Sequence, residues 1–130
     1  MFRDNQAFSS FSVDDIDAAR DFYADKLGLN AEKTKMGTLD LKLGGGQAVM
    51  LYSKPNHEPA TFTVLNLVVP DIEKAVDKLT AAGVDMERYD DNPDINQDAK
   101  GIAHDGRDGP AIAWFTDPAG NVISVLEIPS

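Results

Sequence analysis

Apolar and polar residues alternate from Ala7 to Val13 with the two-residue period of a β-strand, which places Phe11 and Val13 on the face opposite to Phe8, Ser10 and Ser12. Asp15 follows this strand and is a suitable N-cap for a helix. Apolar residues then recur at the spacing of one buried helical face, and Gly28 is expected to end the helix. These apolar residues are Ala19, Phe22, Tyr23 and Leu27.

Three more strands are predicted after this helix, over residues 30–35, 38–43 and 48–53. Gly44–Gly46 joins the last two as a tight hairpin. A phosphate loop is not expected there, because no Lys-Ser or Lys-Thr follows the glycines and no helix begins after them. Residues 54–61 contain two prolines and read as an extended connector.

The second half of the chain repeats this order. Asp71 stands where Asp15 stood, before an apolar stripe of Ile72, Ala75, Val76 and Leu79, and Gly83 corresponds to Gly28. Strands are predicted over residues 85–89, 111–115 and 122–126, with the additional residues of this half in a loop over 90–109. Two copies of strand-helix-strand-strand-strand predict an α+β fold. One copy cannot bury both faces of its sheet, so the copies are expected to pack together or with a second chain.

Residues 117–121 read Asp-Pro-Ala-Gly-Asn between the last two predicted strands and are typical of a turn. With the internal repeat, this string resembles the DPxGN signature of the glyoxalase/bleomycin-resistance/dioxygenase group, the vicinal oxygen chelate superfamily. The resemblance implies paired βαβββ modules that form half-barrel sheets around a cleft, usually in a homodimer. Residues 1–130 would form one such domain, with modules at about 7–53 and 62–128 and a connector at 54–61.

The resemblance also implies metal-binding positions, which map onto Phe8, Met50, Val64 and Ser124. None of these side chains is a normal ligand for a hard or borderline divalent metal, so no metal and no cofactor are expected. Glu127 lies an odd number of residues from Ser124 and should point to the opposite face of a regular strand. A metal-dependent lyase, isomerase or dioxygenase that uses Glu127 and His104 after a register shift remains the alternative.

Other acidic and histidine residues are expected to be solvated. His57 falls in the connector and His104 in the long loop, so surface positions are expected for both. The loop is rich in aspartate, but its spacing does not match a calcium-binding EF-hand. These aspartates are Asp90, Asp91, Asp94, Asp98, Asp105 and Asp108.

Composition and charge limit the possible partners. The 130 residues include no cysteine, and the formal net charge is −10. An acidic surface repels phosphate backbones and anionic lipids, so neither nucleic acid nor a membrane is an expected partner, whereas a cationic small molecule is favoured. No apolar run is long enough to span a bilayer and no leader-like segment is apparent, which predicts a cytoplasmic protein.

The residues expected to face the cleft are neutral hydrogen-bonding, apolar and aromatic groups, which suit recognition better than proton transfer. The sequence therefore predicts a metal-free protein that binds a small organic molecule and that would sequester a cationic or planar antibiotic-like compound. An oligomerisation or regulatory module with an occluded cleft is a third reading. No catalytic residue is assigned, and strand parity alone does not settle which face Trp114 occupies. The candidate ligand-binding residues are Phe8, Ser10, Ser12, Met50, Tyr52, Val64, Asn66, Trp114 and Ser124.

Overall fold

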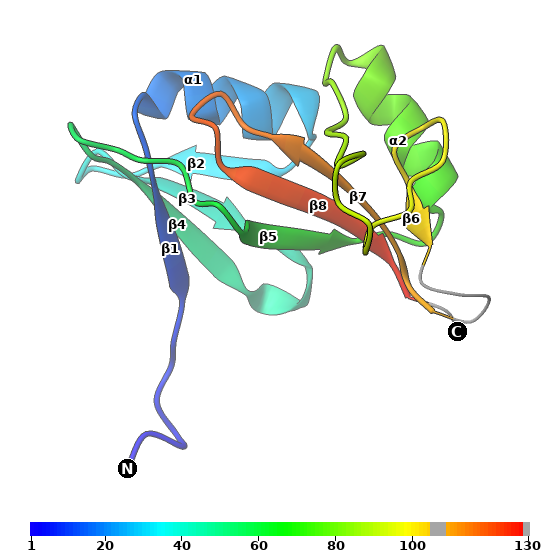
Figure 1. Cartoon of the computed structure of the whole chain (residues 1–130). Helices are drawn as coiled ribbons and strands as arrows, with labels where there is room; N and C mark the ends of the chain where they lie inside the picture. Colours follow the sequence, from blue (N-terminus) through cyan, green and yellow to red (C-terminus); the bar gives the residue numbers. More distant parts are fainter. Residues whose placement is uncertain (105–108, 129–130) are drawn as a thin grey trace. The chain divides into compact units, whose positions relative to one another are not determined.

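The computed structural model describes residues 1–104 and 109–128. The chain divides into two compact units, residues 1–59 and 60–130. Each unit is built on a four-stranded sheet with a helix beside it (Figure 1). The predicted α+β class is confirmed.

Unit 1 contains β1 (Ser9–Val13), α1 (Ile16–Arg20) and its continuation as a π-helix, η1 (Asp21–Lys26). The strands β2 (Asn30–Lys33), β3 (Leu39–Lys42) and β4 (Ala48–Ser53) follow, with the 3-10 turn η2 (Gly44–Gly46) between the last two. The sheet order is β1-β4-β3-β2, in which β1 runs parallel to β4 and the other neighbours are antiparallel. As predicted, Asp15 caps the helix, because its Oδ1 accepts hydrogen bonds from the backbone N–H groups of Asp17 at 3.0 Å and Ala18 at 3.1 Å.

The core of unit 1 lies between the helix and one face of the sheet. Leu39, Leu41 and Leu51 are fully buried on the strands, and Tyr23 is fully buried on the helix. The Tyr23 ring also meets the Phe11 ring edge-on at 6.4 Å, so the odd-numbered residues of β1 face the helix, as the alternation predicts. The even-numbered residues of β1, β3 and β4 therefore occupy the opposite face.

Unit 2 contains β5 (Thr63–Val68), α2 (Ile72–Ala81), β6 (Ala103–His104), β7 (Ala111–Thr116) and β8 (Val122–Glu127), in the sheet order β5-β8-β7-β6. Asp71 caps α2 by accepting from the Lys74 N–H at 3.2 Å. The core again forms between the helix and the odd-numbered strand residues, with Val76, Ile123 and Phe115 among the most deeply buried side chains. No helix in the described part of the chain is long and apolar enough to span a membrane.

One predicted strand is wrong. Residues 85–89 form a single bridge, between Met86 and Phe115, and the edge position of the sheet belongs to β6 instead. The reason is that one side chain of the following loop, Gln97, bonds to backbone groups that a longer strand would have paired. The Oε1 of Gln97 accepts from the Tyr89 N–H at 2.6 Å, and its Nε2 donates to the Glu87 carbonyl at 3.0 Å.

Two strands of unit 1 are shorter than predicted, because a turn forms between them. The Thr34 N–H donates to the Thr38 carbonyl at 2.9 Å, and the two threonine hydroxyls lie 2.7 Å apart. Gly37 has a φ of +83°, a conformation that favours glycine. These contacts end β2 at Lys33 and begin β3 at Leu39.

Candidate functional site

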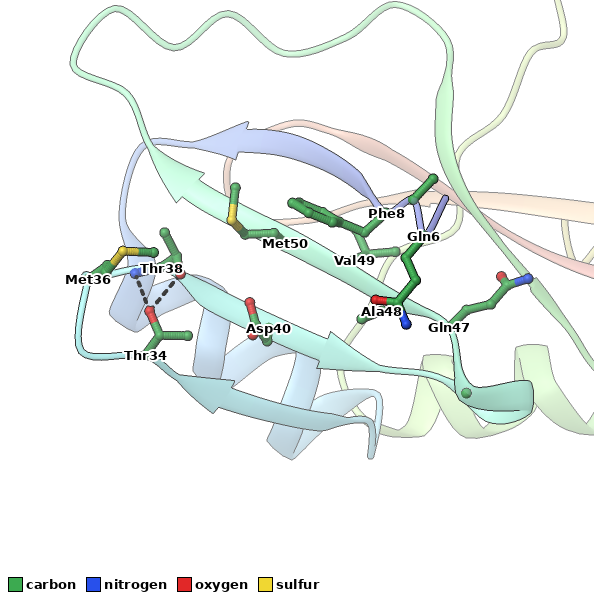
Figure 2. Close-up of a pocket in the computed structure, with 12 residues that line it drawn as sticks. Gln6, Phe8, Thr34, Met36, Thr38, Asp40, Gln47, Ala48, Val49 and Met50 are labelled. Carbon is green, nitrogen blue, oxygen red and sulfur yellow. Dashed lines mark hydrogen bonds between the residues drawn. The ribbon is translucent and has the colours of Figure 1, made fainter. Parts of the chain in front are cut away.

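A pocket of about 760 Å³ lies on the face of the unit 1 sheet that is turned away from the helix (Figure 2). Its lining comes from β3, β4, the β2–β3 turn and the segment before β1. Two residues predicted to bind ligand, Phe8 and Met50, both line it. The pocket also includes Met36, Thr38, Asp40 and Gln47, which the sequence analysis did not single out. It therefore combines an aromatic ring and two thioethers with a few polar groups.

The other predicted residues of unit 1 continue along the same face. Ser10 lies beside Met50 in the register of β1 and β4, and Ser12 lies beside Tyr52. Ser10, Ser12 and Tyr52 do not line the pocket itself. Tyr52 is 36% exposed, and it leaves an aromatic surface on this side of the sheet.

The surface position expected for His57 is wrong. His57 is half-buried, and its Nδ1 lies 2.7 Å from the Ser12 Oγ. The backbone N–H of His57 also donates to the Lys54 carbonyl, and this turn folds the connector back toward β1. The Ser12 hydroxyl is therefore engaged within unit 1, and Ser10 is the more available of the two predicted serines.

Asp40 is the main functional candidate that the sequence analysis missed. It lies directly opposite Met50 in the antiparallel register of β3 and β4, and it is half-buried. Figure 2 shows its carboxyl group rising from β3 on the same side as the Met50 side chain. The signal was present in the sequence, because Asp40 stands between Leu39 and Leu41 and alternation alone places it on the face opposite to the core.

The charges next to Asp40 are already partly paired. The Lys42 Nζ lies 2.9 Å from the Glu32 Oε2, and this hydrogen bond is the main reason that the pKa of Lys42 is raised above its ordinary value. Glu32 and Asp40 are directly opposite each other in the register of β2 and β3. Lys42 is also attracted by Asp40, but its hydrogen bond is to Glu32, so no cation among the described residues forms a close ion pair with Asp40.

In unit 2, the sheet face opposite the helix carries a row of three neighbouring side chains, Asn66, Ser124 and Trp114. Ser124 lies between Asn66 and Trp114 in the register of the three strands, so the structure places Trp114 on the face of Ser124. The buried Ser124 Oγ donates to the Asn66 Oδ1 at 2.5 Å. The polar groups in the middle of this row therefore bond to each other.

Tyr89, which was not among the residues predicted to bind ligand, extends this row. Its ring meets the Trp114 ring edge-on, with the centroids 5.2 Å apart. Burial raises the pKa of the Tyr89 hydroxyl, and the negative charge of Glu87 raises it further. The hydroxyl is therefore protonated at neutral pH. The contact depends on the fold of the long loop, so it could not be found from strand parity.

Val64 departs from the regular alternation on which its predicted role rested. Thr63 pairs with Val122 and Leu65 pairs with Ile123, so Val64 is the extra residue of a β-bulge. A bulge interrupts the two-residue period of a strand. The register therefore does not place Val64 in the row of Asn66 and Ser124, as the regular alternation predicted.

The acidic loop uses several of its own carboxylates. Asp90 forms an ion pair with Arg88 at 3.1 Å. Burial alone would raise the pKa of Asp98, but hydrogen bonds from the N–H groups of Ile102 and Lys100 and from His104 outweigh it and lower that pKa. Asp105 and Asp108, which the calcium reading also considered, lie outside the described residues.

The family of the chain follows from its sequence. The family model of the glyoxalase/bleomycin resistance protein/dioxygenase superfamily matches residues 7–125. The chain belongs to this superfamily. No curated protein matches the sequence.

Solved structures of this superfamily share the fold. The chain is similar to TnmS3, an antibiotic binding protein from Streptomyces sp. CB03234, with 24% identity, a TM-score of 0.65 and 98% of each chain covered. It is also similar to the fosfomycin resistance protein FosX from Listeria monocytogenes, with 9% identity, a TM-score of 0.71 and coverage of 95% of this chain and 92% of that one. A third similar structure is a glyoxalase/bleomycin resistance protein/dioxygenase from Alicyclobacillus acidocaldarius, with 15% identity, a TM-score of 0.68 and coverage of 98% and 95%. At these identities the likeness shows the fold alone.

Glu127 and His104, the alternative metal ligands, lie apart from the metal-binding positions that the superfamily resemblance implies. The Glu127 Oε1 accepts from the Ile72 N–H at 3.0 Å, at the start of α2, so this carboxylate points to the helix side of the sheet. β8 pairs with β7 without a bulge, as the parity argument for Glu127 required. The His104 Nε2 lies 3.5 Å from the Asp98 Oδ2. Within residues 1–104 and 109–128, no three histidine, aspartate or glutamate side chains are grouped so that they could hold a metal ion.

Proposed function

We propose that this protein binds a small organic molecule directly through its side chains, without a metal, and that it acts by sequestering an antibiotic-like compound. The observation that carries the proposal is the pocket of unit 1. Its volume, about 760 Å³, is in the range of small-molecule sites, and its walls combine apolar surface with a few polar groups. Phe8 and Met50 stand where metal ligands would be expected, and both contribute apolar surface to this pocket.

Two further observations support binding rather than turnover. The hydroxyl and amide of Ser124 and Asn66 bond to each other, and the Glu127 carboxylate is bonded at the start of α2. These groups are therefore engaged in the fold. The likeness to an antibiotic binding protein agrees with the proposal at the level of the fold.

The ligand of this proposal is planar or cationic. A flat ring system stacks well on exposed aromatic side chains, and Phe8 and Tyr52 are exposed at 68% and 36%. The net charge of −10 attracts cations over a distance set by the ionic strength. Affinity for a cationic ligand should then fall as salt rises, and a fall of less than about twofold between low and physiological salt would contradict the charge component.

Native mass spectrometry of protein purified without chelator tests the proposal, together with the homodimer that we also propose. We expect a dimer that carries an organic ligand or no ligand. Near-stoichiometric nickel, zinc, manganese or iron would instead favour a metal-dependent lyase, isomerase or dioxygenase.

The four methionines allow the binding site to be located in solution. Met36 and Met50 line the pocket, whereas Met1 and Met86 do not. In protein labelled with 13C at the methionine methyl groups, a bound ligand should shift the signals of Met36 and Met50 and leave that of Met86 unchanged. Assignment by single Met→Leu substitutions completes the experiment. Equal shifts at all four methyl groups, or shifts at Met86 alone, would contradict a ligand site in this pocket.

A further inference from the structure

We infer that the pocket of unit 1 selects ligands with a positive charge and that the Asp40 carboxylate binds this charge. The inference rests on the proposed function and adds to it the chemical class of the ligand and the residue that determines it.

Asp40 lies in the wall of the pocket. It projects from β3 into the pocket, opposite Met50, in a wall that also contains Met36 and Thr38 (Figure 2). It is half-buried, so part of its hydration is replaced by protein. An ion pair formed at such a position is screened less by water and salt than a pair on the open surface.

The fold engages the Asp40 carboxylate only weakly: nearby Lys42 attracts it, and this attraction is the smallest of the causes that raise the pKa of Lys42. Among residues 1–104 and 109–128, the structure shows no hydrogen bond or ion pair to its carboxylate. The nearby Lys42 bonds to Glu32 at 2.9 Å. Asp15, Asp71 and Asp117 differ in this respect, since each of them accepts backbone N–H groups and so holds a helix end or a turn. The Asp40 carboxylate is therefore available to a ligand.

The other walls of the pocket suit an organic cation. Phe8 presents an aromatic ring at the pocket, and the face of such a ring attracts cations. Met36 and Met50 are flexible and polarizable, so they adapt to the apolar body of a ligand. Inorganic cations are less suited, because a hard metal ion needs several oxygen ligands, and Asp40 is the only carboxylate among the described residues that line the pocket.

A matched pair of dyes separates charge from shape. 9-Aminoacridine is a cation at neutral pH, and acridine has the same ring system and is neutral there. Their dissociation constants are measured by fluorescence titration at low salt, with wild-type protein, Asp40→Asn and Asp25→Asn. Asp40→Asn keeps the size of the side chain and removes its charge. Asp25→Asn removes the same charge from an exposed position on η1, on the other side of the sheet.

We expect wild-type protein to bind the cation more tightly than the neutral dye. Asp40→Asn should weaken binding of 9-aminoacridine by about tenfold, the effect of 1.4 kcal/mol of lost attraction, and should change binding of acridine by less than about twofold. Asp25→Asn should change both by less than about twofold, because an exposed charge is screened. The methyl signals of Met36 and Met50 report whether each dye occupies the pocket.

Three results would overturn the inference alone, and a fourth would overturn the proposed function with it. Equal weakening by Asp40→Asn and Asp25→Asn would assign the effect to the total surface charge, and equal weakening of both dyes would assign it to pocket shape. Wild-type protein that binds acridine as tightly as 9-aminoacridine would also refute it, even if Asp40→Asn failed to fold, but would leave the proposed function standing. If neither dye bound at about 1 mM and neither shifted the Met36 and Met50 signals, the proposed function would fail as well.

Discussion

The two units share one order of elements, but they differ in what they leave available on the sheet face opposite the helix. In unit 1 this face is hollowed, and the half-buried Asp40 carboxylate forms no hydrogen bond or close ion pair with any described residue. In unit 2, Ser124 bonds to Asn66, and Trp114 packs against Tyr89. A repeated backbone therefore does not leave the same side chains available, and only those that the fold has not engaged can serve a ligand.

The difference can be traced to the connections between the strands. Unit 1 joins its last two strands through Gly44–Gly46, and its pocket lies beside this turn. Unit 2 places a long loop between α2 and β7, and this loop carries Tyr89 to Trp114. The loop is held in place by Gln97, which accepts from the Tyr89 N–H and donates to the carbonyls of Glu87 and Gly101. Substitutions can test each part of this comparison.

The largest effect is expected at Ile102, which makes the long loop part of the core of unit 2. Its side chain is fully buried, so Ile102→Ala should lower the free energy of unfolding by about 2–5 kcal/mol through lost apolar contact and a cavity. Urea denaturation followed by circular dichroism measures this loss. Ile95→Ala is the control, since Ile95 is only half-buried in the same loop and should cost less. Equal losses would mean that the loop is not anchored at Ile102.

The second largest loss of unfolding free energy is expected when Gln97 is substituted. Gln97→Ala leaves the Tyr89 N–H and the Glu87 and Gly101 carbonyls without this partner, which we expect to cost about 1–3 kcal/mol of unfolding free energy. It should also loosen the contact of Tyr89 with Trp114, which is visible in the fluorescence of the single tryptophan. Asn96→Ala changes the exposed neighbour and should leave both measurements close to wild type. Unchanged fluorescence in Gln97→Ala would show that Tyr89 is positioned by other contacts.

A smaller effect is expected in the short turn of unit 1. Gly45 has a φ of +83° and no atom within 4 Å of where a Cβ would lie, so Gly45→Ala introduces backbone strain without a clash. We expect a loss of about 1–2 kcal/mol. Gly44→Ala is the matched control, since Gly44 does not have a positive φ and its surroundings are equally open. If the two variants were equally stable, the turn would not require the left-handed conformation at Gly45.

The smallest effect concerns the pH dependence of the loop. The hydrogen bonds to Asp98 lower its pKa in the folded state, so its contribution to stability is present above the ordinary value of about 3.9 and is lost as the pH falls through the lower, folded value. Asp98→Asn should therefore flatten the decline of unfolding free energy below about pH 4. The effect is small because the Asp98 side chain is 37% exposed. Asp94→Asn controls for net charge, and an identical flattening in that variant would contradict the role of Asp98.

Features that depend on neighbouring residues in the chain could be predicted from the sequence. Asp15 and Asp71 cap their helices as expected, and Gly28 and Gly83 follow the helices with positive φ. Helix capping and left-handed turns are decided by one residue and its immediate neighbours. Phe8 and Met50 both line the pocket; Phe8 was placed by the alternation over residues 7–13, and Met50 by the resemblance to the superfamily.

The sequence by itself thus determined the repeated α+β order, the helix ends and the side of each regular strand that faces the core. Only the tertiary structure decided that residues 85–89 do not form a strand, that His57 bonds to Ser12 and that Trp114 shares a face with Ser124. It also decided that Asp40 lies in a pocket where no described residue forms a hydrogen bond or a close ion pair with its carboxylate. The physical reason is that strand register and hydrogen-bond partners join residues far apart in the chain, and a local pattern of apolar and polar residues does not specify which of them meet.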